Sequence, residues 1–240
     1  ENIMFGKMIN AITAPGETFE IIVKEFNLKQ ALMPIALLMG LAVVSGFVLQ
    51  DLIADMQWEQ IEKSIEGNTQ ISEEQKDEIL SKQYDRVYSK TGMSAIFTYI
   101  SMAISWPLRI VFWSLFAMLA ANLFLGGGGK FGQIFTVSAF AYMPSVIEYI
   151  IKTPIQYISD NMMIFTGLGA LGIGEQGDFI NSFLAGLDIF AFWRVFLMAV
   201  GVGIIYNKTT KTSLSVMTGL WIFGLIVFAG IGAAVSGMFG

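Results

Sequence analysis

The chain has 240 residues and a net charge of −5; 55% of its residues are hydrophobic and only 14% are charged. Soluble domains carry about 25% charged residues, so this composition and a mean hydropathy of +0.64 predict an all-helical integral membrane protein. Cysteine and histidine are both absent, which excludes thiol chemistry, histidine bases and the usual zinc, copper and haem ligands. We expect no metal, no cofactor and, without a basic patch, no nucleic-acid partner.

Residues 1–28 have the pattern of short amphipathic helices at the cytoplasmic face. Apolar residues recur at helical spacing at Met8, Ile12, Phe19, Ile22, Val23 and Phe26. Thr13 is predicted to cap a second helix that has Pro15 in its first turn, where a missing N–H does no harm. The helices are expected either to lie on the membrane surface or to pack under the transmembrane bundle.

Residues 29–240 are predicted to form a five-span transmembrane domain. The apolar runs cover residues 29–52, 93–125, 131–151, 183–206 and 214–238. The glycines at 126–129 cannot continue a helix and predict a tight turn before the third span. Pro107 and Pro144 lie inside the second and third spans and are expected to kink them.

Residues 53–92 are an acidic insertion between the first two spans. Ser72 and Gln75 form a capping-box signature, which predicts a hairpin of two helices. Each helix has one apolar stripe, and together the stripes comprise Trp58, Ile61, Ile65, Leu80, Tyr84 and Tyr88. These stripes predict a surface that docks a partner, while the acidic residues have the simpler reading of a solvated face.

The distribution of lysines predicts the orientation of the chain. The short loops at Lys130 and Lys208 fall on the same side of the predicted bundle as Lys7, Lys24 and Lys29. Lys/Arg in short loops face the cytoplasm, so we expect a cytoplasmic N-terminus and an extracytoplasmic hairpin.

Besides Lys29 and Asp51 at the ends of the first span, four charged residues fall within the predicted spans: Arg109, Glu148, Asp188 and Arg194. Charges are costly in a membrane, so we expect these side chains to pair inside the bundle. The pairing is either a structural cluster that fixes helix register or a polar groove for a lipid headgroup, since arginine binds phosphate bidentately. No nucleophile–base pair, phosphate loop or metal spacing is present, so we expect no enzyme.

Several segments together resemble the Yip1 domain family, in its bacterial branch. They are residues 14–19 (Ala-Pro-Gly-Glu-Thr-Phe), the glycine turn before Phe131, Tyr142-Met143-Pro144, residues 188–193 (Asp-Ile-Phe-Ala-Phe-Trp) and the turn at 208–213. The resemblance implies a polytopic membrane protein with no catalytic residues to carry over. Some bacterial members resemble accessory subunits of ABC exporters with periplasmic adaptors, whereas the eukaryotic association with Rab GTPases does not transfer.

Two functions follow as hypotheses. The first is a non-catalytic accessory or scaffolding subunit of a membrane assembly in the bacterial cytoplasmic membrane, with an ABC exporter as the candidate assembly. The second is a small lipid translocator or scramblase that uses the intramembrane charges. The expected partners are membrane lipids and other integral membrane subunits.

Overall fold

The computed structural model describes residues 2–68, 70–89, 92–175 and 177–239, and every named element in these ranges is a helix. The N-terminal half contains α1 (Asn2–Thr13), α2 (Pro15–Lys24), α3 (Leu32–Val48), α4 (Gln50–Glu66), α5 (Glu73–Val87) and α6 (Gly92–Phe124). The C-terminal half contains α7 (Phe131–Ala141), α8 (Pro144–Ser159), α9 (Phe179–Gly186), α10 (Ile189–Ile205) and α11 (Thr210–Phe239). Short 3-10 helices cover Leu28–Ala31 and Leu168–Leu171.

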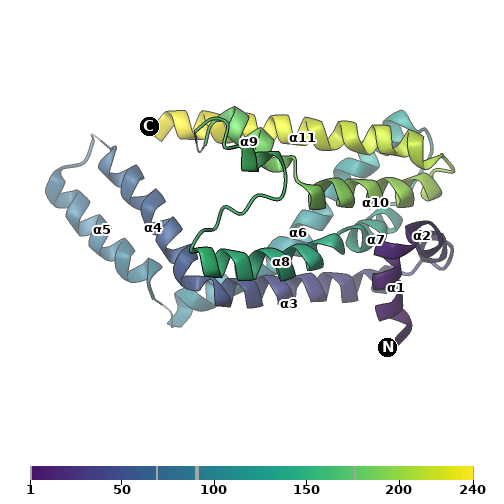
Figure 1. Ribbon diagram of the computed structural model, residues 1–240, viewed down its shortest axis with the longest axis horizontal. Coiled ribbons are helices and arrows are strands. Elements are labelled where there is room, and N and C mark those ends of the chain that lie inside the picture. The colour runs from purple at the N-terminus through teal and green to yellow at the C-terminus, as the bar shows by residue number, and fades with distance from the viewer. Residues whose placement is uncertain (1, 69, 90–91, 176, 240) are drawn as a thin grey trace.

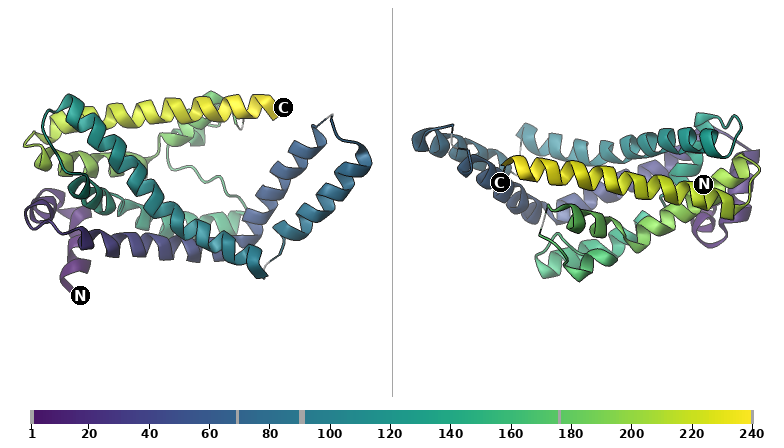
Figure 2. Two further views of the ribbon diagram at one scale, coloured as in Figure 1. Left: turned by 180° about the vertical axis from the view of Figure 1, so that it is seen from behind. Right: turned by 90° about the horizontal axis from the view of Figure 1, so that it is seen from above.

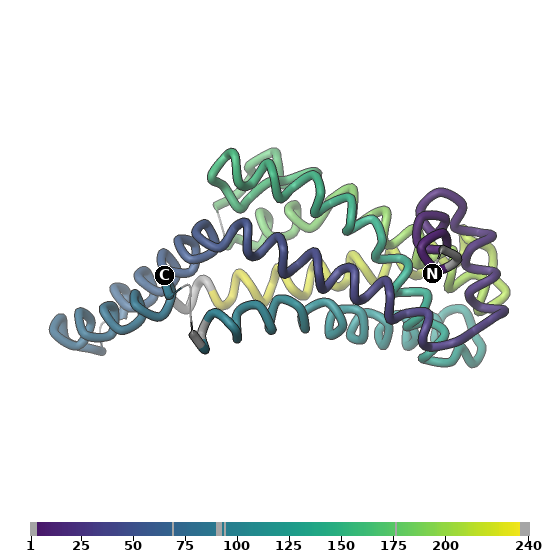
Figure 3. Tube along the Cα trace, turned by 90° about the horizontal axis from the view of Figure 1, so that it is seen from below, coloured from purple at the N-terminus to yellow at the C-terminus, as the bar shows by residue number. Residues whose placement is uncertain are grey.

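The long helices lie side by side along one axis of the molecule (Figure 1). The chain runs along this axis in alternating directions through α3, α6, α7 with α8, α10 and α11, and the two termini lie at opposite ends. Seen from below, α3 lies between α8 and α6, and it contacts both (Figure 3). The hairpin of α4 and α5 projects from the end opposite α1 and α2 (Figure 2).

Four stretches are long and apolar enough to cross a membrane: Leu28–Val48, Ala95–Phe124, Phe131–Ser159 and Thr210–Val235. The protein is therefore an integral membrane protein with membrane-spanning helices. The fourth predicted span is shorter than expected, because α9 and α10 divide it at Leu187 and Asp188 and α10 has only 17 residues. The Asp188 carboxylate accepts a hydrogen bond from the Phe190 N–H (2.8 Å), so it caps α10 and fixes this break.

The two prolines predicted as kinks behave differently. Pro144 is the first residue of α8, and a turn at Tyr142 and Met143 separates α8 from α7. Pro107 lies inside α6, which is unbroken from Gly92 to Phe124. Our prediction that the third apolar run ends at Ile151 was wrong, because α8 continues to Ser159 and accommodates Pro154 within it.

The N-terminal helices pack against the bundle. Phe19 and Ile22 of α2 are buried, and α2 contacts α10 and α7. Phe5, Ile9 and Ile21 remain exposed on the outer side. The predicted cap was wrong, because Ala14 occupies the N-cap position of α2 and the Thr13 hydroxyl donates to the Ile9 carbonyl instead.

The centre of the bundle is built around α10, which contacts α11, α7, α2 and α8. Small residues allow these helices to approach closely. A Cβ at Gly201 would overlap Val137 of α7, and both positions are buried. This is the close helix contact that small residues permit in membrane bundles.

The predicted glycine turn joins α6 to α7. Gly126 and Gly127 have φ angles of +68° and +129°, which residues with a side chain rarely adopt. A Cβ at Gly129 would lie 2.5 Å from the Tyr206 hydroxyl, so the turn packs directly over the end of α10. Tyr206 in turn donates a hydrogen bond to Asn122 (2.6 Å).

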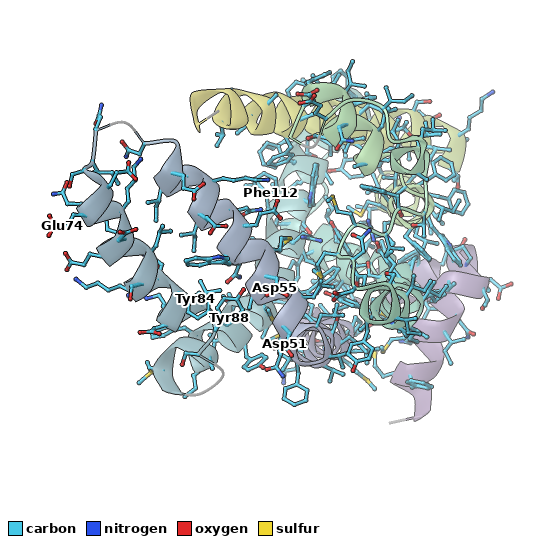
Figure 4. The ribbon with its side chains drawn as sticks, turned by 60° about the vertical axis from the view of Figure 1, so that its left-hand side comes forward. Asp51, Asp55, Glu74, Tyr84, Tyr88 and Phe112 are labelled. Carbon is cyan, nitrogen blue, oxygen red and sulfur yellow. The ribbon has the colours of Figure 1, made fainter. Side chains whose placement is uncertain are left out.

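The hairpin helices pack against each other. The predicted capping box at Ser72 and Gln75 is present. The ring of Tyr84 lies 5.1 Å from Trp58 and 4.5 Å from Tyr88, and Tyr88 donates a hydrogen bond to Asp55 (2.8 Å). In Figure 4, Asp55, Tyr84 and Tyr88 lie close together near the base of the hairpin, while Glu74 points outward. Part of the stripes that we expected to face a partner therefore contacts the other helix of the hairpin.

Candidate functional site

A network of alternating charges links α8 to α10. Arg194 of α10 donates to the Glu148 carboxylate (2.6 Å) and to the Ser145 hydroxyl (2.9 Å). The other oxygen of Glu148 accepts from Lys152 (2.8 Å), one helical turn further along α8. Lys152 also donates to Asp188 (3.1 Å), which joins the start of α10 to the same network.

Asp188 has further partners that hold it in place. One of its oxygens accepts from the Phe190 N–H, and the other, which Lys152 contacts, also accepts from the Thr166 hydroxyl. Thr166 belongs to the irregular segment after α8, and Gly167 forms an isolated bridge with Asp188. The charged network therefore also attaches this segment to the bundle.

The side chains of the network are largely enclosed. Their exposed fractions are 11% for Asp188, 18% for Lys152, 21% for Arg194 and 23% for Glu148. All four carboxylate oxygens accept hydrogen bonds, so neither acid is left as an unpaired buried charge. Charged side chains inside a membrane-spanning bundle are tolerated when they are paired and hydrogen-bonded in this way.

The structure brings together three of the four residues expected in the cluster, Glu148, Asp188 and Arg194, and adds Lys152 to them. Lys152 joins both acids, and we overlooked it because the third span was predicted to end at Ile151. Its spacing of four residues from Glu148 was the available signal, since residues four apart share one helix face.

Arg109 is placed differently from our expectation. Within the described ranges, its guanidinium forms no ion pair with a carboxylate, and its side chain is exposed. It lies at the middle of the apolar stretch Ala95–Phe124 and stacks 5.1 Å from the centre of the Trp106 ring. Trp106 is itself buried and donates to the Tyr149 hydroxyl (3.0 Å), so the ring under Arg109 is held in position.

Arg109 and Arg194 line one cavity of about 460 Å³ between the helices. Its walls come from α6, α7, α10 and α11, with Gly186 of α9 at one side. Apart from the two arginines, the lining consists of aromatic and apolar residues with Ser138 and Tyr142, including Trp113, Met198, Leu220, Trp221 and Leu225. The Tyr142 ring lies 5.8 Å from the Arg194 guanidinium. The cavity therefore combines an apolar wall with two cationic groups, of which only Arg194 is neutralised by an acid.

Among the residues that the structure describes, no three His, Cys, Asp or Glu side chains gather as metal ligands would.

The comparison with protein families decides where the chain belongs. The Yip1 domain family model matches residues 9–231, which is nearly the whole chain. The chain belongs to the Yip1 domain family. Among curated proteins and solved structures nothing matches it. The charged network and the Arg109 cavity both lie within the residues that the Yip1 domain model matches.

Proposed function

We propose that this Yip1 family protein is a non-catalytic lipid translocator whose cavity binds the headgroup of a membrane lipid beside Arg109. The observation that carries the proposal is an exposed arginine without a carboxylate partner, in the described chain, at the middle of an apolar helix. An arginine at the centre of a membrane helix costs about 2.5–3.5 kcal/mol on insertion scales. A bound phosphate group would repay this cost through charge-assisted, bidentate hydrogen bonds.

The shape of the cavity supports a lipid as the ligand. Its apolar wall of tryptophan, methionine and leucine side chains suits the upper part of an acyl chain. Its volume of about 460 Å³ falls within the range of small-ligand sites. A headgroup at Arg109 with chains along the exposed apolar helix faces would keep each part of the lipid in a matching environment.

We further propose that α10 is a fifth span. Its 17 residues rise about 26 Å, a few ångströms less than a typical hydrocarbon core. The lysine-bearing turns at Lys130 and Lys208 lie at the same end as α1 and α2. The positive-inside rule then makes that end cytoplasmic, in a bacterial cytoplasmic membrane, and makes the hairpin extracytoplasmic.

The experiment is lipid transfer in reconstituted vesicles. A fluorescent phospholipid on the inner leaflet is protected from a membrane-impermeant reductant outside the vesicle. It loses its fluorescence only after it has been moved to the outer leaflet. We expect wild-type protein to transfer lipid, and Arg109→Gln to lower the rate at least tenfold while the protein remains folded and monodisperse. Arg86→Gln removes one positive charge from the exposed surface of α5 and is the matched control. Equal transfer by wild-type and Arg109→Gln protein, or no transfer by either, contradicts the proposal.

A second candidate function is an accessory or scaffolding subunit of a membrane assembly, with an ABC exporter and its periplasmic adaptor as the candidate assembly. The hairpin favours it, because α4 and α5 project from the bundle and Tyr84 remains 50% exposed on a helix with no buried residue. A membrane partner that binds this hairpin would contact its acidic outer face and the exposed edge of its aromatic stripe.

Co-purification tests the subunit function. The protein is solubilised gently from its own membrane, and the bound proteins are identified for the wild type and for a variant in which a short glycine-serine linker replaces residues 53–89. A stoichiometric partner that disappears with the hairpin supports the subunit function. Absence of a stoichiometric partner, or a partner that remains after the deletion, argues against it.

A further inference from the structure

We infer that the cavity binds anionic lipids in preference to zwitterionic ones. The preferred lipid has one net negative charge on its phosphate and no ammonium group in its headgroup. This inference rests on the proposed lipid-binding function and names the class of headgroup. It follows from the number of charges in the bundle and from the partners that those charges already have.

The first argument is the charge balance. The described bundle helices carry three cations near the cavity and network (Arg109, Lys152 and Arg194) against two carboxylates (Glu148 and Asp188). The two carboxylates are shared between Lys152 and Arg194, so the excess positive charge is that of Arg109. One phosphodiester anion would neutralise it.

No carboxylate is among the residues that line the cavity, and the two carboxylates of the network are already paired with cations. Glu148 accepts from Lys152 through one oxygen and from Arg194 through the other. Asp188 accepts from Lys152 and Thr166 through one oxygen and from the Phe190 N–H through the other. An ethanolamine headgroup bound at Arg109 would therefore place its cation against a wall that offers no carboxylate to pair with it.

The two arginines also repel a cationic headgroup. Any cation inside the cavity would lie near two guanidinium groups, because Arg109 and Arg194 both line it. For a zwitterionic lipid, the attraction between its phosphate and Arg109 is offset by the repulsion between its ammonium group and the two arginines. An anionic lipid such as phosphatidylglycerol carries only the favourable part, with hydroxyl groups that can hydrogen-bond without charge.

The test is lipid binding to the purified protein, measured by native mass spectrometry after delipidation and addition of defined lipids with identical acyl chains. We expect phosphatidylglycerol to bind at least tenfold more tightly than phosphatidylethanolamine. Arg109→Gln should remove this preference, while Arg86→Gln should leave it intact. Inorganic phosphate added alone at the same concentration should not displace phosphatidylglycerol, because it lacks the chains that the apolar wall holds.

The outcomes separate the inference from the function on which it rests. Equal binding of both lipids, with each weakened by Arg109→Gln, overturns the headgroup selectivity and leaves lipid binding at Arg109 in place. Binding of either lipid that is unchanged by Arg109→Gln overturns both. Displacement of phosphatidylglycerol by inorganic phosphate alone shows a site for free anions and overturns the lipid assignment.

Discussion

Lys152 is the residue on which the charged network depends, because it contacts an acid from each of two segments. Replacing it by alanine leaves one Glu148 oxygen without its donor and removes the cation beside Asp188, in a site that is 11–23% exposed. Asp188 keeps its hydrogen bonds from Thr166 and the Phe190 N–H but loses the neutralising charge. Removing one partner of a buried ion pair typically costs 3–5 kcal/mol. We therefore expect Lys152→Ala to lower the stability of the folded protein by about 3 kcal/mol, measured by thermal unfolding in detergent through tryptophan fluorescence.

A double variant shows whether this loss comes from the stranded acid. Lys152→Met combined with Asp188→Asn removes both charges of the pair, and it should be more stable than Lys152→Met alone. Lys152→Arg, which keeps the charge, should lose least. If the double variant is less stable than the single variant, Asp188 does not depend on Lys152 and the network is not the source of the stability.

Tyr88 gives a pH-dependent contact outside the membrane. Its hydroxyl donates to the Asp55 carboxylate, and this hydrogen bond raises the pKa of Tyr88 to about 12. Because the neutral phenol is the donor, the contact is fully present below pH 10 and is lost as the pH rises towards 12. The ultraviolet titration of wild type minus Tyr88→Phe should show a midpoint near 12, and Asp55→Asn should move that midpoint towards the ordinary tyrosine pKa. A Tyr88 midpoint unaffected by Asp55→Asn would contradict the contact.

At the scale of the helix pair, the contact between α7 and α10 depends on Gly201. A Cβ there would overlap Val137, whose branched side chain is buried and has no free space to move into. We expect Gly201→Ala to destabilise the protein by about 1–3 kcal/mol through overpacking. Adding Val137→Ala should restore part of the loss, because it removes the atoms that overlap. Thermal unfolding of the two single variants and the double variant measures the coupling, and strictly additive losses would contradict this account.

Gly46 of α3 provides a comparison for the same substitution. A Cβ at Gly46 would meet the thioether of Met102 on α6. Methionine has three rotatable bonds and can move aside. Gly46→Ala should therefore cost clearly less than Gly201→Ala in the same unfolding experiment, and an equal or larger cost would mean that the α3–α6 contact is as rigid as the α7–α10 contact.

The helices themselves were predictable to the degree that their signals were local. Hydrophobic length marked the four membrane-spanning stretches, and the capping residues Ser72 and Gln75 marked the start of α5. The interruptions at Tyr142 and Asp188 were less visible in the sequence, because a helix that is broken inside an apolar run keeps the same composition. The sequence also failed to predict that α8 continues beyond Pro154. Lys152 and Pro154 indicated a helix end, but in the structure Lys152 pairs with Asp188 and α8 continues to Ser159.

The candidate site was predicted less fully than the fold, since it depends on distances between helices. The sequence predicted that Arg109, Glu148, Asp188 and Arg194 fall within membrane spans, but the choice of partners required the packed bundle. In the structure, the acids pair with Lys152 and Arg194, whereas Arg109 lines the cavity. No local pattern distinguishes these two arginines, because the difference comes from which helix each one faces.

The arrangement of the whole molecule depends on whether α10 crosses the membrane. If it does, the turn at Thr210 lies on the side opposite the hairpin, and if it does not, both lie on one side. The chain has no cysteine, so single cysteines can be introduced without removing native ones. We expect Ser64→Cys, on the exposed surface of α4, to react with an impermeant maleimide in intact cells. Thr210→Cys should react only after lysis.

Each result of this labelling has one structural meaning. Labelling of both cysteines in intact cells would place the two turns on the same face and would contradict a crossing α10, because the two turns lie at opposite ends of the bundle. The reverse pattern, with only Thr210→Cys labelled, would keep α10 as a span and invert the orientation. The expected pattern would place the lysine-bearing end in the cytoplasm, so that a lipid entering from that leaflet would pass the basic turns before it reached Arg109.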